Sequence, residues 1–137
     1  STITIAAGSG PIASGDSFYN STDLYWLSRI IYAESGNQSL EGKIAVGNVV
    51  LNRVASSLFP NSVYDVIFQR NQFTPASSGS INREPSEDAV IAAKLCLDGA
   101  NTADNALYFV NPKVSPNSWA SRNCTYVATI GAHAFFA

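Results

Sequence analysis

The feature that most constrains the fold of this chain is a change in the spacing of its apolar residues near residue 100. From Leu24 to Ile31, apolar residues recur every three or four positions, so their side chains share one face of a helix. Beyond Ala106, short apolar runs bounded by turn residues replace this pattern, which is typical of strands. Helices followed by strands predict an α+β fold, because the two kinds of element then form separate layers.

The helical part is expected to contain four helices, over about residues 24–35, 39–54, 63–68 and 87–98. Asp23 can cap the first helix. Pro85-Ser86-Glu87-Asp88 opens the last one, because acidic residues favour the positive end of the helix dipole. Between the third and fourth helices, residues 70–85 are polar and rich in turn formers. This composition predicts a long loop of the kind that often carries function.

Three strands are expected toward the C-terminus, over residues 106–110, 126–130 and 134–136, with a turn at Gly131 between the last two. The helices and strands together predict one domain over residues 23–137. Residues 1–22 are rich in Ser, Thr, Gly and Ala, which predicts a linker or a loosely attached leader.

The composition argues against several function classes. The 137 residues are 46% apolar and 13% charged, which fits one well-packed domain. A net charge of -2 gives no electrostatic basis for binding DNA, RNA or anionic lipid. No apolar run reaches the roughly 18 residues that span a membrane, and no signal peptide is visible. Cys96 and Cys124 lie 28 residues apart, which leaves a disulfide and two buried thiols as equal alternatives.

Glu34 is the most unusual residue of the first helix. It continues the spacing that starts at Leu27 and Ile31, so the apolar face of the helix ends in a carboxyl group. Burial raises the pKa of a carboxyl group, and the C-terminal end of a helix disfavours its negative charge. A carboxyl that stays protonated near neutral pH can act as the general acid in glycosidic bond cleavage. The alternative is an ordinary glutamate at a frayed helix end that points at Arg29 or Lys43.

The nucleophilic and metal-binding residue types form weaker patterns. His133 is the only histidine, and with two distant cysteines it makes no zinc site, so we expect neither a metal nor a cofactor. A Cys–His nucleophilic pair with Cys96 or Cys124 is the remaining alternative. Cys96, however, lies within a predicted helix among apolar residues, where a packed thiol is expected.

Several polar and aromatic side chains would suit a sugar-binding groove. Asn48 and Asn52 are one helical turn apart, and their amides could either line such a groove or bond to loop backbone. Asn111 follows a predicted strand, where it could bind a ligand or hydrogen-bond within the turn. Aromatic rings could stack on sugars, although each is also a candidate for the core. These rings belong to Tyr32, Phe73, Tyr108 and Trp119.

The chain also contains several sequence blocks in a fixed order. The series opens with Leu27-Ser28-Arg29-Ile30-Ile31-Tyr32-Ala33-Glu34-Ser35-Gly36-Asn37 and Glu41-Gly42-Lys43-Ile44-Ala45-Val46-Gly47-Asn48-Val49-Val50-Leu51-Asn52-Arg53-Val54. It continues with Phe59-Pro60-Asn61-Ser62-Val63, Val66-Ile67-Phe68-Gln69 and Gln72-Phe73-Thr74. It ends with Ala106-Leu107-Tyr108-Phe109-Val110-Asn111-Pro112 and Ile130-Gly131-Ala132-His133-Ala134-Phe135-Phe136. In this order the blocks, over about residues 24–136, resemble the SleB/CwlJ cell wall hydrolases, which include the spore cortex-lytic enzymes.

The resemblance implies a lysozyme-like or lytic-transglycosylase-like helical lobe with a small antiparallel β-sheet toward the C-terminus. Such domains cleave peptidoglycan between N-acetylmuramic acid and N-acetylglucosamine. The glutamate of the Tyr-x-Glu block is the family's catalytic acid, and it falls on Glu34. Residue types and blocks together give these candidates for substrate binding: Tyr32, Asn48, Asn52, Gln72, Phe73, Tyr108, Asn111, Trp119 and His133.

The resemblance also implies where such a chain works and with what. The expected partner is peptidoglycan, in particular spore cortex that contains muramic-δ-lactam and is degraded during germination. The expected location is secreted or spore-associated, at the cortex or the outer face of the inner membrane. The leader would then follow an N-terminal peptidoglycan-binding module.

The matched blocks offer no clear second acid for a two-carboxylate hydrolase. Glu41, Glu84 and Asp65 are the available candidates, and none has a fitting sequence context. A single-acid mechanism is therefore expected, in which Glu34 protonates the leaving oxygen and then helps to close a 1,6-anhydro ring. The alternatives are a hydrolytic muramidase or glucosaminidase, a non-catalytic peptidoglycan-binding module, and a peptidoglycan amidase or peptidase.

Overall fold

The structure is a computed structural model that describes residues 20–137. Residues 1–19, most of the predicted leader, lie outside the described residues. Helix α1 (Ser21–Ser35) begins before the expected boundary at Asp23. Asn20 caps it by accepting a hydrogen bond from the Thr22 backbone N–H at 2.8 Å, so the prediction of Asp23 as the cap is wrong. Asp23 lies in the first turn instead, where its charge favours the helix dipole.

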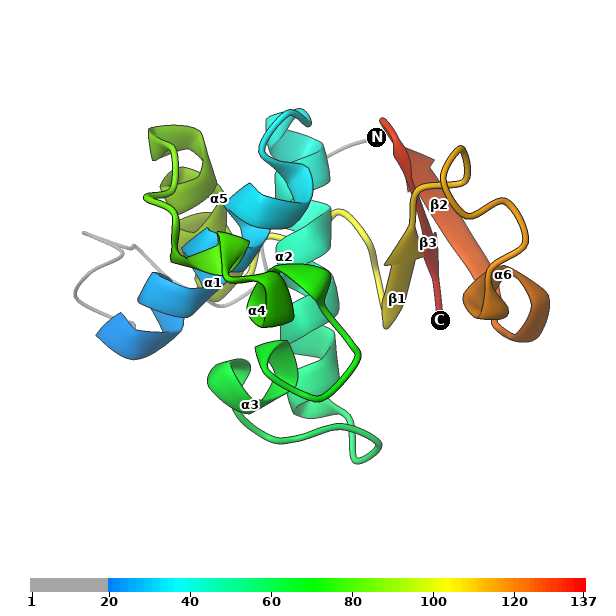
Figure 1. Ribbon diagram of the computed structural model, residues 1–137, viewed down its shortest axis with the longest axis horizontal. Helices are drawn as coiled ribbons and strands as arrows, with labels where there is room; N and C mark the ends of the chain where they lie inside the picture. Colours follow the sequence, from blue (N-terminus) through cyan, green and yellow to red (C-terminus); the bar gives the residue numbers. More distant parts are fainter. Residues whose placement is uncertain (1–19) are drawn as a thin grey trace.

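The helical part is built around α2 (Leu40–Ala55), in which every residue from Gly42 to Val50 is buried. Helices α1 and α5 (Glu87–Leu97) pack against α2, and the short α3 (Val63–Ile67) lies against both α1 and α2 (Figure 1). The four predicted helices are confirmed. A serine side chain caps each of α2, α3 and α5, namely Ser39, Ser62 and Ser86.

The segment 70–85, expected to be a loop, contains α4 (Thr74–Ser78) and the 3-10 helix η2 (Ser80–Asn82), so this prediction is wrong in part. Pro75 stands in the first turn of α4, where its fixed φ and its missing N–H fit a helix. Ile81 of η2 is buried in the main core and fixes the segment there. Both elements are too short to show an apolar period.

The strands β1 (Tyr108–Val110), β2 (Tyr126–Ile130) and β3 (His133–Phe136) form an antiparallel sheet in the order β1-β3-β2. All residues of the central strand β3 are buried. The predicted strands are confirmed, as is the α+β class with a small antiparallel sheet toward the C-terminus. Helix α6 (Trp119–Asn123) lies between β1 and β2 in the chain and was not among the expected elements, because five residues carry no apolar period.

The sheet and α6 stand beside the helical part (Figure 1), and both β1 and β2 contact α2. The main core lies between α1, α2 and α5 and extends to Ile130 and Phe135 of the sheet. A smaller apolar cluster joins Ala120 of α6 to Ala134 and Phe136 of β3. Within residues 20–137, none of the helices has both the length and the apolar character needed to cross a membrane.

Both cysteines are free thiols, so the disulfide alternative is not realised. Cys96 lies in the main core, where its S–H donates to the carbonyl oxygen of Ile44 at a distance of 3.3 Å. Burial raises the pKa of the Cys96 thiol to about 12, which removes its reactivity near neutral pH. Cys124 is half-buried beside the smaller apolar cluster. These positions argue against Cys96 as a nucleophile.

Gly47 gives a test of the packing between the helices. A Cβ atom at this position would lie 2.6 Å from the Cys96 sulfur and 3.0 Å from Cδ1 of Ile31. We predict that Gly47→Ala lowers the free energy of unfolding by about 1–3 kcal/mol, because the overlap outweighs a gain in helix propensity of about 1 kcal/mol. Urea denaturation measures the change. Adding Cys96→Ala should recover much of the loss, and a Gly47→Ala chain as stable as the unaltered one would contradict this packing.

Candidate active site

Glu34 lies in the last turn of α1, where it continues the apolar face of the helix. Leu27 and Ile31 of that face are fully buried, whereas Glu34 is half-buried. The helix ends directly afterwards, at Gly36, where a Cβ atom would lie 2.6 Å from the carbonyl oxygen of Tyr32. A residue without a side chain is therefore needed at position 36, and it lets the chain turn away just beyond Glu34.

The Glu34 carboxyl has no hydrogen bond or ion pair with any residue in the range 20–137. The cations named above as its alternative partners are engaged elsewhere. Arg29 lies 3.5 Å from the Glu84 carboxylate, and Lys43 Nζ donates to the carbonyl oxygen of Gln38 at 2.5 Å. Burial raises the pKa of Glu34 above its ordinary value of 4.5. A desolvated carboxyl without a partner is thus biased toward its protonated form, as an acid catalyst requires.

Glu34 lines two hollows in the surface. The first, which we call the Tyr32 hollow, has a volume of about 410 Å³ and is lined by Tyr32, Ala33, Glu34, Gly36, Asn37 and Arg83. The second, the His133 hollow, has a volume of about 450 Å³ and brings Glu34 together with residues of the sheet and its loops. Its other lining residues are Gln72, Thr74, Phe109, Val110, Asn111, Val114, Ser115 and His133.

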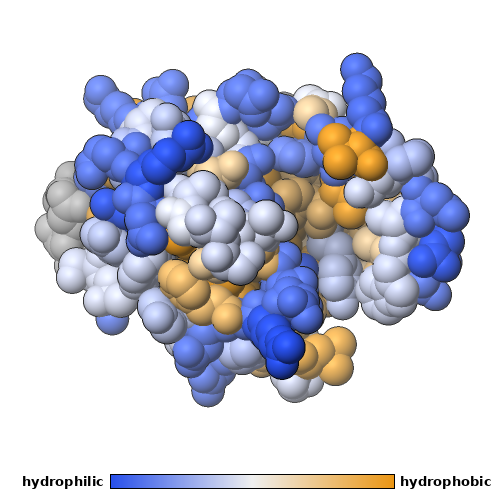
Figure 2. Space-filling model, in the orientation of Figure 1, coloured by the Kyte–Doolittle hydropathy of each residue, from blue (hydrophilic) through white to orange (hydrophobic). Residues whose placement is uncertain are grey.

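A third hollow, the Arg53 hollow, continues from the second. It is lined by Arg53, Phe59, Gln72, Tyr108, Phe109, Val110, Ser118, Trp119 and Ala120. Because neighbouring hollows share lining residues, the three form one cleft, with Glu34 where the first two meet. Figure 2 shows the surface hollowed between the helical part and the sheet. Glu34 is the only acidic residue that lines this cleft in the part of the chain from residue 20 onward.

His133, the first residue of β3, forms part of the wall that the sheet contributes. Its ring packs edge-on against Phe109, with the ring centroids 5.1 Å apart. Its Nδ1 atom is buried and finds no hydrogen-bond partner among the described residues. Burial lowers the pKa of His133, so the imidazole is neutral near neutral pH. His133 therefore contributes hydrogen bonding, and no charge, to the hollow that contains Glu34.

The cleft brings together many of the side chains expected at the site. Tyr32 shares the Tyr32 hollow with Glu34, and the His133 hollow contains Gln72, Asn111 and His133. Tyr108 and Trp119 line the Arg53 hollow.

The remaining candidates lie elsewhere in the fold. The Asn48 amide donates to the carbonyl oxygen of Ala100 at 2.8 Å and accepts from the Thr102 backbone N–H at 2.8 Å. The Asn52 amide donates to carbonyl oxygens of the same segment, residues 104 and 106. These bonds agree with the second of the two roles proposed above, binding to loop backbone. Phe73 is buried in the main core, with its ring centroid 6.3 Å from that of Phe109.

Several cleft residues were not among the predicted candidates. Thr74, Arg83 and Ser115 belong to turn-rich segments, and no spacing in the sequence indicates that these segments fold back onto α1. Arg53 carried a weak signal, because it lies in the same helical block as Asn48 and Asn52. An arginine on an otherwise apolar helix face is visible in the sequence, and this feature could have marked Arg53 as a candidate.

A family model described as Cell Wall Hydrolase matches residues 37–136 of this chain. The solved catalytic domain of the germination-specific lytic transglycosylase SleB from Bacillus anthracis is 34% identical, with a TM-score of 0.80. That similarity covers 88% of this chain and 98% of the SleB domain. The chain belongs to the SleB/CwlJ-type cell wall hydrolases.

Other relatives agree with this membership. The crystal structure of the Bacillus cereus SleB catalytic domain is 32% identical, with a TM-score of 0.80 over 96% of this hydrolase and 98% of that domain. The spore cortex-lytic enzyme of Oceanobacillus iheyensis is 33% identical over 128 residues, which are 93% of this chain and 46% of the relative. That of Bacillus subtilis is 34% identical over 117 residues, 85% of this chain and 38% of the relative. The chain thus spans less than half the length of these curated relatives.

The comparisons confirm the expected lysozyme-like or lytic-transglycosylase-like fold. The family match begins at Asn37, just after Glu34. The similarity to the Bacillus cereus domain covers 96% of the hydrolase and therefore extends across Glu34 as well. Glu34 and the cleft around it thus lie within the region shared with these catalytic domains.

The unpaired carboxyl gives a prediction about stability. Burial raises the pKa of Glu34 in the folded state above its value in the unfolded state. The stability that the protonated carboxyl contributes is therefore fully present below the unfolded-state pKa. It is lost as the pH rises through the folded-state pKa, because the carboxyl then ionises in a desolvated position. At pH 7 we expect Glu34→Gln, which cannot ionise, to melt about 2–5 °C higher than the unaltered hydrolase, and we expect this gain to vanish at pH 4. Calorimetry at the two pH values measures both melting temperatures.

Glu84→Gln is the matched control, because the Glu84 side chain is 89% exposed. It should not show a stabilisation that appears only at pH 7. A Glu34→Gln chain that melts lower than the unaltered hydrolase at pH 7 would contradict the unpaired state of the carboxyl.

Proposed function

We propose that this cell wall hydrolase cleaves the glycan strands of peptidoglycan between N-acetylmuramic acid and N-acetylglucosamine, with Glu34 as the catalytic acid. The observation that carries the proposal is the half-buried carboxyl of Glu34, which has no partner within residues 20–137 and lies where two hollows meet. Relatives named as a germination-specific lytic transglycosylase and as spore cortex-lytic enzymes support the reaction class. They also support spore cortex as the substrate and a spore-associated or secreted location.

The part of the cleft beside Glu34, the His133 hollow, suits a neutral polysaccharide, because its other polar side chains are uncharged. Amide and imidazole groups of Gln72, Asn111 and His133 lie beside Glu34 and can hydrogen-bond to hydroxyl and N-acetyl groups. Tyr32 on one side and Trp119 on the other offer aromatic faces for sugar rings. A glycan strand would run through the three hollows, with the scissile bond beside Glu34.

The reaction would proceed in two proton transfers through one residue. Protonated Glu34 donates its proton to the glycosidic oxygen as the bond from that oxygen to C1 of the muramoyl residue breaks. Neutral dipoles of the cleft and the substrate's own N-acetyl group stabilise the oxocarbenium-like charge. The Glu34 carboxylate then takes the proton of the muramoyl 6-hydroxyl, whose oxygen bonds to C1 and closes a 1,6-anhydro ring. Glu34 is protonated again at the end, and no water is consumed.

The acid content of the cleft supports this route over simple hydrolysis. Glycosidases with two carboxylates hold them about 5–9.5 Å apart on either side of the scissile bond. Among residues 20–137, no acidic residue other than Glu34 lines the cleft, and Glu84 is bound to Arg29. A lytic transglycosylase therefore fits better than a hydrolytic muramidase or glucosaminidase. In a binding module without catalysis, the desolvated Glu34 carboxyl in the cleft would have no function.

Product analysis tests the proposed reaction. We expect digestion of spore cortex or cell-wall sacculi to release muropeptides that lack one water relative to hydrolysis products, because the 6-hydroxyl replaces water as the nucleophile. Mass spectrometry distinguishes the two products. Reducing-end muramic acid or N-acetylglucosamine would mean hydrolysis, and the absence of any turnover would mean a binding module.

Substitution of the acid tests the role of Glu34. We predict that Glu34→Gln lowers the rate of cortex solubilisation by about 10²–10⁴-fold, because an amide cannot donate the proton. Sacculus binding should persist, since the amide keeps the shape of the side chain. Glu84→Gln is the matched control and should retain activity. Full activity in Glu34→Gln would remove Glu34 from the mechanism.

A further inference from the structure

Arg53 is a buried cation without a carboxylate partner. Only 4% of the residue is exposed, and no ion pair joins it to an acidic residue in the part of the chain that the structure describes. Its Nε donates to the carbonyl oxygen of Leu107 at 2.7 Å, and a terminal nitrogen donates to Oε1 of Gln72 at 3.1 Å. A guanidinium has five N–H donors, so these bonds use two of them. Both acceptors are neutral, so no carboxylate among the described residues compensates the positive charge.

Three aromatic rings surround the Arg53 guanidinium. Its central carbon lies 4.7 Å from the ring centroid of Phe59, 5.1 Å from that of Phe73 and 5.2 Å from that of Tyr108. Ring faces attract a cation and hold the guanidinium plane in place, but they supply no counter-charge. Burying an unpaired charge is costly. An anion that reached this guanidinium would therefore recover part of that cost.

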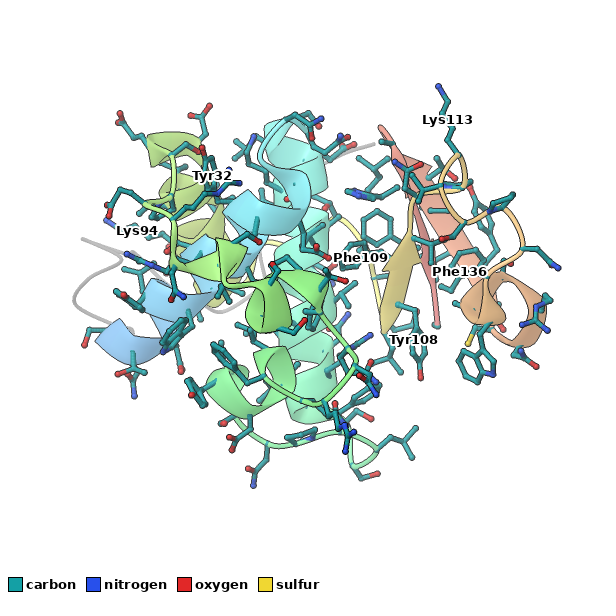
Figure 3. All side chains as sticks on the ribbon, in the orientation of Figure 1. Tyr32, Lys94, Tyr108, Phe109, Lys113 and Phe136 are labelled. Carbon is teal, nitrogen blue, oxygen red and sulfur yellow. The ribbon has the colours of Figure 1, made fainter. Side chains whose placement is uncertain are left out.

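The Arg53 hollow gives an anion that access. Arg53 lines it together with Gln72, Tyr108 and Trp119, and its volume is about 410 Å³. Trp119 is 57% exposed, and its ring centroid lies 5.5 Å from that of Tyr108. Gln72 and Phe109 also line the His133 hollow, which contains Glu34. Figure 3 shows Phe109 projecting from β1 toward the helical part. A group held by Arg53 would thus belong to a substrate bound beside Glu34.

We propose that the Arg53 hollow is a subsite for a carboxylate on the peptide substituent of the glycan strand. The sugar backbone is uncharged, whereas peptides attached to the lactyl group of muramic acid carry free carboxylates. Arginine suits such a group, because its planar fork can bind both carboxylate oxygens. This inference rests on the proposed function, since it takes peptidoglycan as the substrate. It adds a preference for strands with an anionic substituent at the residue that occupies this hollow.

A purely structural role for Arg53 makes a different prediction. In that case Arg53 only ties α2 to Leu107 and Gln72, and its replacement would weaken binding of every ligand in the same proportion. A carboxylate subsite instead changes the ratio between charged and uncharged ligands. The test therefore compares two ligands that differ in one group.

The probes are N-acetylmuramoyl-L-alanine and its carboxamide, titrated into Glu34→Gln hydrolase and followed by NMR. The chain has two tryptophans. The indole of Trp119 reports on the hollow, whereas Trp26 packs against Tyr64 and Phe68 and serves as an internal reference. We expect the free acid to bind about tenfold more tightly than the amide, with shifts at Trp119 and none at Trp26.

Variants of Arg53 complete the test. Arg53→Gln should remove the difference between acid and amide, and Arg53→Lys should keep part of it through a point charge. Arg122→Gln is the matched control, because this exposed cation on α6 does not line the hollow and its loss should leave the difference intact. Equal binding of acid and amide to the Arg53-intact chain would overturn the proposal, even if the Arg53 variants fail to fold. An equal loss of affinity for both ligands in a folded Arg53→Gln chain would also overturn it.

This binding test does not depend on cleavage. If the protein binds the acid more tightly than the amide but does not cleave cortex, only the proposed function is contradicted. Cleavage of cortex without discrimination would contradict the subsite alone.

Discussion

The carboxyl group at the end of the apolar face of α1 is the constraint on which the candidate site depends. Leu27 and Ile31 fix that face in the core, and each buried side chain of this size contributes about 1.5–3 kcal/mol. Because the helix is held there, Glu34 is half withdrawn from water, and none of the described residues forms an ion pair with it. Packing thus supports an energetically unfavourable group, and the protonated form of Glu34 is favoured as a result.

The second wall of the cleft is positioned by polar residues of α2. Asn48, Asn52 and Arg53 bind successive carbonyl groups of the segment that leads into β1, from Ala100 to Leu107. This segment leads directly into β1, so these bonds hold the first strand of the sheet against α2. Polar side chains on a core helix therefore serve the site by orienting backbone, and Arg53 also lines the cleft.

The sequence predicted the parts of the fold that have a clear period. α2 and α5 combine apolar spacing with serine caps, and β2 and β3 flank a glycine turn. It missed α4, η2 and α6, because three to five residues are too few to show a period. Glu34 stood out because a carboxyl on an apolar face conflicts with its surroundings. The neighbours of Glu34 in the cleft could not be predicted from spacing, since Gln72, Asn111 and His133 come from distant segments that only the tertiary fold brings together.

Glu34 combines a raised pKa with the lack of any partner among residues 20–137, at the point where the Tyr32 and His133 hollows meet. The most direct test is an NMR titration of the Glu34 side-chain carboxyl carbon in isotope-labelled protein, assigned with Glu34→Gln. We expect a midpoint above the ordinary glutamate value of 4.5, because burial disfavours the charged carboxylate. A midpoint at or below that value would mean that the carboxyl is solvated or paired, and would contradict its role as the proton donor.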